Sequence, residues 1–78
     1  MDELSLYYLP SCPYCHKVLR FMDTNGIVID TKSTTEPTNK AHLLEVGKKN
    51  QVPCLMVNGK PLYESDDIIA YLRDKFVD

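Results

Sequence analysis

The order of apolar patterns along the chain predicts an α/β fold: a four-stranded mixed sheet flanked by helices, in the order β-α-β-α-β-β-α. The chain begins with a strand pattern at 4–8, helical spacing from 13 to 22 and a β-branched run at 27–29. This order predicts a parallel strand pair with a right-handed crossover. Asn58-Gly59 lies between two apolar runs, which is a strong signal for a hairpin of antiparallel strands. A parallel pair combined with a hairpin makes the expected sheet mixed.

The first half of the chain predicts a strand, a helix and a second strand. The first strand is indicated by the alternation of Leu4, Leu6 and Tyr8 with Ser5 and Tyr7. Pro13 suits the first position of a helix, where its missing N–H costs no hydrogen bond. The apolar face of that helix consists of Cys15, Val18, Leu19 and Met22. Asn25-Gly26 ends it, and Ile27-Val28-Ile29 is expected to be the second strand.

The second half predicts a helix, the hairpin and a last helix. The polar stretch 32–39 is expected to be a loop that leads into a helix carried by Ala41, Leu43, Leu44 and Val46. Gly47-Lys48-Lys49-Asn50 closes this helix, and strands are expected at 53–57 and around 61–63. Ser65 is expected to cap the last helix, with Asp66 and Asp67 in its first turn, where the helix dipole favours negative charge. The buried face of that helix is assigned to Ile68, Ile69, Leu72 and Phe76.

Composition restricts the class of protein. The 78 residues suffice for one domain, expected to span 1–78, and 44% hydrophobic with 26% charged residues is typical of a soluble globular domain. A net charge of −2 with interspersed signs argues against a nucleic-acid partner. Met1-Asp2-Glu3 opens the chain without a cationic leader or a long apolar run, so we expect no signal peptide and no membrane span.

The three cysteines point to a reducing compartment. An odd number, with two of them three positions apart, is a poor disulfide framework for a secreted protein, so we expect a cytoplasmic location. Cys54 directly follows Pro53 and could be a third redox thiol near the site, but burial in the core is favoured because free cysteine is often buried. Met22 and Met56 are also expected in the core. His42 is expected on a solvated helix face.

Cys12-Pro13-Tyr14-Cys15 is a C-x-x-C motif at the junction of a predicted strand and helix. The unpaired N–H groups and the dipole at a helix N-terminus stabilise a thiolate, which is the attacking species in disulfide exchange. Cys12 is therefore predicted to be the nucleophile, and Cys15, one turn into the helix, the resolving thiol. His16 and Lys17 are expected to add positive charge nearby.

Three other interpretations of the cysteine pair stay open. A structural zinc site needs about four ligands, and only Cys54, His16 and His42 remain, none at ligand spacing, so no metal is expected. Cys12 to His16 also matches the C-x-x-C-H signature of haem attachment, and the pair could simply be buried and inert.

With these elements in place, the sequence resembles the glutaredoxin family, which has a thioredoxin-like fold. Cys-Pro-Tyr-Cys is the dithiol active-site form of that family, Val52-Pro53 matches its Val-Pro element, and Ser65-Asp66-Asp67 resembles its third element. The resemblance covers nearly the whole chain. It implies that the bond before Pro53 is cis, that glutathione is a co-substrate, and that no cofactor is tightly bound.

The resemblance also implies which residues bind glutathione: Tyr14, Gln51, Val52, Pro53, Glu64, Ser65 and Asp66. The backbone at Gln51-Val52 would pair with the tripeptide as an added strand. The start of the last helix would hold its γ-glutamyl carboxylate, and the Asp66 side chain its ammonium group. On residues alone, helix capping is the favoured explanation of Ser65, Asp66 and Asp67, and both roles can hold at once.

The chain departs from the family at two places. Leu9 stands where glutaredoxins commonly carry a lysine that pairs with the glycine carboxylate of the ligand; Lys48, Lys49 or Gln51 are the possible substitutes. Glu64-Ser65 replaces a Gly-rich stretch and is similar to the N-terminal domain of glutathione transferases and of a larger two-domain glutaredoxin. No all-helical second domain, as a transferase would need, is expected.

The resemblance therefore implies a monomeric, glutathione-dependent thiol–disulfide oxidoreductase acting on glutathionylated or disulfide-containing proteins through Cys12 and Cys15. Two alternatives remain. One is a redoxin that takes electrons from thioredoxin reductase, which Leu9 leaves open. The other is a module that binds glutathione and an iron–sulfur cluster.

Overall fold

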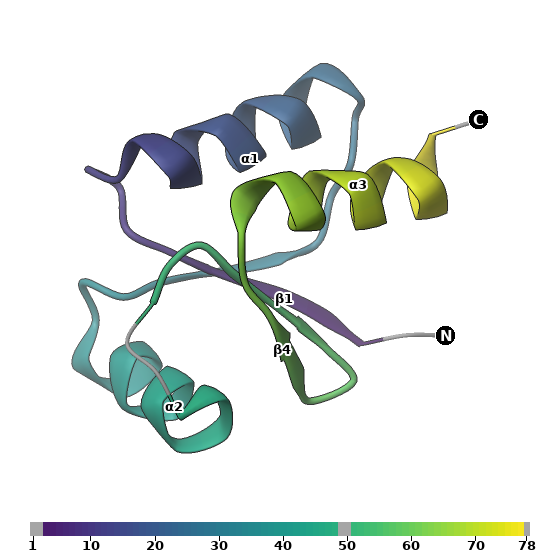
Figure 1. Ribbon diagram of the computed structural model, residues 1–78. Helices are drawn as coiled ribbons and strands as arrows, with labels where there is room; N and C mark the ends of the chain where they lie inside the picture. The colour runs from purple at the N-terminus through teal and green to yellow at the C-terminus, as the bar shows by residue number, and fades with distance from the viewer. Residues whose placement is uncertain (1–2, 49–50, 78) are drawn as a thin grey trace.

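The central sheet has the strand order β2-β1-β3-β4, with helices on both faces (Figure 1). A computed structural model describes residues 3–48 and 51–77 of the chain. The elements are β1 (Leu4–Tyr8), α1 (Pro13–Thr24), β2 (Asp30–Ser33), α2 (Pro37–Gly47), β3 (Cys54–Val57), β4 (Lys60–Leu62) and α3 (Ser65–Phe76). β1 is parallel to β2 and antiparallel to β3, and β4 is antiparallel to β3. The predicted fold class, element order and mixed sheet are thus confirmed.

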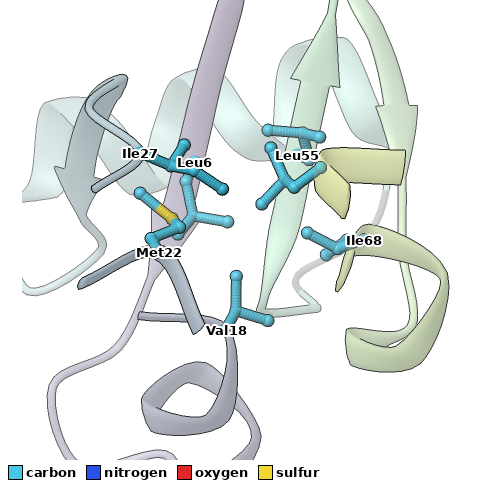
Figure 2. Packing of buried hydrophobic residues seen from close by; sticks show 7 residues of the cluster. Leu6, Val18, Met22, Ile27, Leu55 and Ile68 are labelled. Atoms are coloured by element: carbon cyan, nitrogen blue, oxygen red, sulfur yellow. The ribbon is translucent and has the colours of Figure 1, made fainter. Parts of the chain in front are cut away.

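The larger core lies between the sheet and the pair of helices α1 and α3, which run side by side on one face (Figure 1). Leu6 and Leu55 are cross-strand partners on this face of the sheet. Figure 2 shows how the helices add Val18, Met22 and Ile68 around them. Burial of each large aliphatic side chain contributes about 1.5–3 kcal/mol, so this layer fixes α1 and α3 against the sheet.

A smaller core lies on the opposite face, beneath α2. Tyr7 and Cys54 are cross-strand partners there and pack with Leu43 of α2. Tyr7 is only 1% exposed, and its hydroxyl is hydrogen-bonded to Nδ1 of His42. His42 is exposed, as predicted, but this hydrogen bond also ties α2 to β1. Because both faces of the sheet are covered, successive residues of the central strands are buried, although their side chains point to opposite faces.

The second strand was predicted at the wrong place. It is Asp30–Ser33, not Ile27–Ile29, and it pairs with β1 from Ser5 onward. Ile27 belongs to the C-terminal cap of α1, because its N–H donates to the Met22 carbonyl (2.9 Å) and Gly26 before it has a φ of 64°. The side chains of Met22 and Ile27 both join the larger core. This is a Schellman motif with its hydrophobic contact, and the strand begins only after it.

Other predicted boundaries need smaller corrections. α2 begins at Pro37, which lies within the stretch predicted as a loop, because proline suits the first helical turn. Phe76 was assigned to the buried face of the last helix, but it is the last residue of α3 and is 44% exposed. The hairpin is confirmed, with positive φ at Asn58 and Gly59. α2 ends at Gly47, with Lys48 in the left-handed region; Lys49 and Asn50 lie outside the described residues.

A dithiol and a pocket at the end of the first helix

The fold brings the C-x-x-C pair to the N-terminal end of α1. After β1 the chain turns, and the N–H of Cys12 donates to the Leu9 carbonyl (3.0 Å). Cys12 is the N-cap of α1, with Pro13 as its first residue. Cys12 is half-buried, whereas Cys15 is 0% exposed, and all three cysteines are free thiols. An attacking reagent therefore reaches Cys12 first.

Hydrogen bonds in the first turn favour the thiolate of Cys12. Burial acts to raise the pKa of Cys12, but hydrogen bonds from the N–H and the thiol of Cys15, and from the N–H of Tyr14, outweigh it. The net result is a pKa below the ordinary value of 9.0. This is the electrostatic pattern of a reactive cysteine at a helix N-terminus.

Cys15 has the opposite environment. Burial raises its pKa to about 11, and the adjacent Cys12 adds to the rise through its charge and a hydrogen bond. The N–H of Leu9 donates to the Cys15 Sγ (N···S 3.4 Å) and acts in the other direction without cancelling the effect of burial. The two thiols, one helical turn apart, thus have pKa values shifted in opposite directions. Sequence reasoning missed the part played by Leu9, because a backbone donor carries no signal in the residue type.

The two basic residues suggested as help for Cys12 have partners of their own. His16 Nε2 is hydrogen-bonded to the Pro10 carbonyl, and Lys17 forms an ion pair with Asp66. That pair links α1 to the first turn of α3, and both side chains remain more than half exposed. Stabilisation of the Cys12 thiolate therefore rests on the hydrogen bonds of the first turn.

A pocket of about 430 Å³ lies between the start of α1, the segment before β3 and the start of α3. The structure brings together at this pocket all seven residues that the resemblance implies for glutathione: Tyr14, Gln51, Val52, Pro53, Glu64, Ser65 and Asp66. Tyr14 is 66% exposed at its edge, whereas Pro53 is buried. The Val52–Pro53 peptide bond is cis, as the resemblance implied.

The start of α3 differs from the prediction at one residue. Ser65 does not cap the helix: Glu64 is the N-cap, and it makes no capping hydrogen bond through its side chain. Glu64 turns the chain from β4 into the helix with a φ of 68°, which places Ser65 in the first turn and buries it. A non-glycine residue in the left-handed region beside a pocket is the kind of local strain that clusters at binding sites. Asp66 and Asp67 lie in the first turn, as predicted.

Of the two described residues suggested to replace the missing lysine, Gln51 lines the pocket and Lys48 does not. Leu9 is half-buried, and Lys48 is exposed after the end of α2. Lys49 lies outside the described residues.

The remaining candidates concern the third cysteine, a metal site and a membrane span. Cys54 is 0% exposed, as predicted, and burial raises its pKa to about 11. Across residues 3–48 and 51–77, no group of three or more His, Cys, Asp or Glu side chains is arranged to hold a metal ion. None of the helices described there is long and apolar enough to cross a membrane.

Comparison with known proteins gives related results in sequence and in structure. The chain is 28% identical to "Glutaredoxin 1" of Rickettsia typhi over 81 aligned positions, which cover all of this chain and 78% of that protein. A glutathione transferase Omega 3C from Trametes versicolor superposes with a TM-score of 0.81 at 28% identity, over 95% of this chain and 32% of the transferase. "Glutathione S-transferase unclassified 2" from Bombyx mori gives 0.82 at 26%, over 97% and 37%.

The chain thus spans about a third of the length of these transferases. Residues 6–78 match the family model described as "Glutathione S-transferase, N-terminal domain". Nearly the whole sequence is covered by that match, and the fold agrees with it. The chain therefore belongs to the glutathione S-transferase N-terminal domain family, with a thioredoxin-like fold and glutaredoxin-named relatives.

Proposed function

We propose that this protein is a glutathione-dependent thiol–disulfide oxidoreductase of the glutaredoxin type. The Cys12 thiolate attacks the glutathione sulfur of a mixed disulfide, and a Cys12–glutathione disulfide forms. The client thiolate leaves and takes a proton from water. The thiolate of a second glutathione then attacks the glutathione sulfur on Cys12, which releases oxidised glutathione and regenerates the Cys12 thiolate.

One observation carries this proposal: a half-buried cysteine with a lowered pKa lies at the start of the same helix that lines the pocket. Thiolate attack needs access and a thiol that ionises more readily than usual, and Cys12 is half-buried with a pKa below the ordinary value. The relatives named glutaredoxin and glutathione transferase support glutathione as the ligand of the pocket.

The pocket also offers groups suited to each part of a tripeptide. Gln51 and Val52 precede β3 and offer backbone hydrogen-bonding groups for an added strand. The first turn of α3 offers N–H groups for a carboxylate. Asp66 offers a carboxylate for the ammonium group of glutathione, which would share it with Lys17.

Cys15 supports a second route that starts only after Cys12 has reacted. While Cys12 is a thiolate, its charge and hydrogen bond raise the pKa of Cys15. Both influences end when Cys12 carries glutathione or a client protein. Cys15 can then attack the Cys12 Sγ, form the Cys12–Cys15 disulfide and release the bound thiol. Two glutathione molecules reduce that disulfide again, so protein disulfides are reduced at the expense of glutathione.

The test is turnover of a small glutathione mixed disulfide with glutathione, NADPH and glutathione reductase. Cys12→Ser should abolish turnover. Cys15→Ser should leave the removal of glutathione largely intact and block the reduction of protein disulfides. Near-normal turnover by Cys12→Ser would refute the assignment.

A second electron donor is favoured by one observation, the leucine at position 9 in place of a ligand-pairing lysine. A parallel reaction with thioredoxin reductase and NADPH, without glutathione, tests it. Activity in that reaction alone would assign the protein to redoxins that do not use glutathione.

A further inference from the structure

A second, larger hollow lies on the outer surface of the two helices that run side by side in Figure 1. It has a volume of about 730 Å³, and its lining comes from α1, from the residue that follows α1, and from α3. We call it the α1–α3 groove. Of its lining, the functional roles assigned so far use only Asp66 and its partner Lys17.

The α1–α3 groove combines an apolar floor with cationic walls. Phe21 and Ile69 are half-buried in its lining, and the Arg73 guanidinium lies over the Phe21 ring, 5.5 Å from the centroid. Arg20 is exposed on the α1 wall. The lining holds Lys17, Arg20 and Arg73 but only one carboxylate, that of Asp66. This excess of positive charge stands out in a chain whose net charge is −2.

The α1–α3 groove is continuous with the reactive end of the molecule. Pro13, which lines it, directly follows Cys12 in the chain. Asp66 lines both the α1–α3 groove and the pocket that we assign to glutathione. A polypeptide seated in the groove would therefore extend toward the disulfide being reduced at Cys12.

We propose that the α1–α3 groove holds an acidic segment of the client protein, one with a large apolar or aromatic side chain beside its carboxylates and close to its glutathionylated cysteine. This inference rests on the proposed function and names the clients that the same site prefers. The apolar anchor packs on Phe21 and Ile69, and the carboxylates pair with Arg20 and Arg73. Complementary charge of this kind selects partners and speeds their encounter.

The experiment compares two synthetic glutathionylated peptides that differ only in the flanking residues, Phe-Glu-Glu against Phe-Lys-Lys. We expect kcat/KM to be about threefold to tenfold higher for the acidic peptide, the range for one or two exposed ion pairs. Raising the salt concentration should shrink this preference. Arg20→Glu should reduce or reverse it, because the charge reversal now suits the basic peptide.

Lys40→Glu is the matched control, since it makes the same charge change on α2, on the opposite face of the sheet. It should leave the preference unchanged. Turnover of a small glutathione mixed disulfide should be the same in all three proteins, because that substrate does not reach the α1–α3 groove.

Equal kcat/KM for the two peptides, with normal turnover of the small substrate, would overturn the inference and leave the proposed function standing. Dimerisation in solution that Arg20→Glu abolishes would also overturn it, because the groove would then hold a second copy of the chain. Absence of turnover with the small substrate would instead refute the proposed function, and with it the basis of this inference.

Discussion

The pH dependence of resolution by Cys15 gives a sharp test of the active-site electrostatics. In the intermediate with glutathione on Cys12, the charge and the hydrogen bond of Cys12 no longer raise the pKa of Cys15. Burial, the largest influence, remains, and so does the weaker opposing hydrogen bond from the Leu9 N–H. The pKa of Cys15 in this intermediate should therefore lie between the ordinary value of 9.0 and about 11.

These bounds set the expected rate. With a pKa between 9.0 and about 11, the ionised fraction of Cys15 at neutral pH is roughly one in a hundred to one in ten thousand. The rate of internal resolution should rise about tenfold per pH unit from neutral pH to at least the ordinary pKa of a thiol, because only the thiolate attacks. This rate can be compared with the rate at which free glutathione attacks the same intermediate, which stops rising with pH once the glutathione thiol is ionised.

The assay starts from protein glutathionylated at Cys12 and freed of excess glutathione. Samples are quenched with acid at intervals, and the loss of the glutathione mass is followed by mass spectrometry at each pH. Cys15→Ser should retain its glutathione, which controls for hydrolysis and for transfer to Cys54. A rate that is already constant around neutral pH would refute the claim that burial governs Cys15.

Three further outcomes are expected. A Cβ at position 47 would lie 2.5 Å from the Tyr63 hydroxyl oxygen. Gly47→Ala should therefore break the hydrogen bond from that hydroxyl to the Gly47 carbonyl and lower the free energy of unfolding by about 1–2 kcal/mol in urea titrations; an equal loss in a Tyr63→Phe background would contradict this cause. Folded Cys15 and Cys54 have a pKa of about 11 against 9.0 unperturbed, so these thiols lose their protons at lower pH in the unfolded chain than in the folded one. Their contribution to the free energy of unfolding should be fully present below pH 9 and should fall by about 2–3 kcal/mol per thiol between pH 9.0 and about pH 11. Cys54→Ala should make that fall, measured by thermal unfolding, shallower. Tyr14→Ala should raise KM for glutathione several-fold without changing the alkylation rate of Cys12, because Tyr14 lines the pocket with an exposed ring; a changed alkylation rate would show that it acts on the thiol instead.

The elements that the sequence predicted well are those set by local chemistry. Asn58-Gly59 specifies a tight hairpin through its own backbone preferences, and Pro13 specifies a helix start. The second strand failed because a parallel register is not local: β2 is placed by the end of α1 and by pairing with β1. Gly26 followed by apolar Ile27 is a capping signal that, weighed against β-branching, would have moved the strand toward its true position.

In the candidate site too, some features were predictable from the sequence and others depend on tertiary packing. The motif residues lie at the ends of elements, and the family resemblance carried by three short motifs named every residue that lines the smaller pocket. The ion pair of Lys17 with Asp66 and the position of Arg73 over Phe21 depend on how α1 packs against α3. No residue pattern within one helix indicates that packing, so these contacts could only come from the structure.

The pKa of Cys12 depends on local helix structure, whereas the pKa of Cys15 depends on tertiary structure. Capping position alone predicts that Cys12 is the better nucleophile, because N–H groups of the first turn face it in any helix that starts at Pro13. The raised pKa of Cys15 requires the sheet, since the burial that causes it depends on β1 lying beneath α1. A change that loosens α1 from the sheet should therefore affect resolution more than the first attack, which separates the two steps physically.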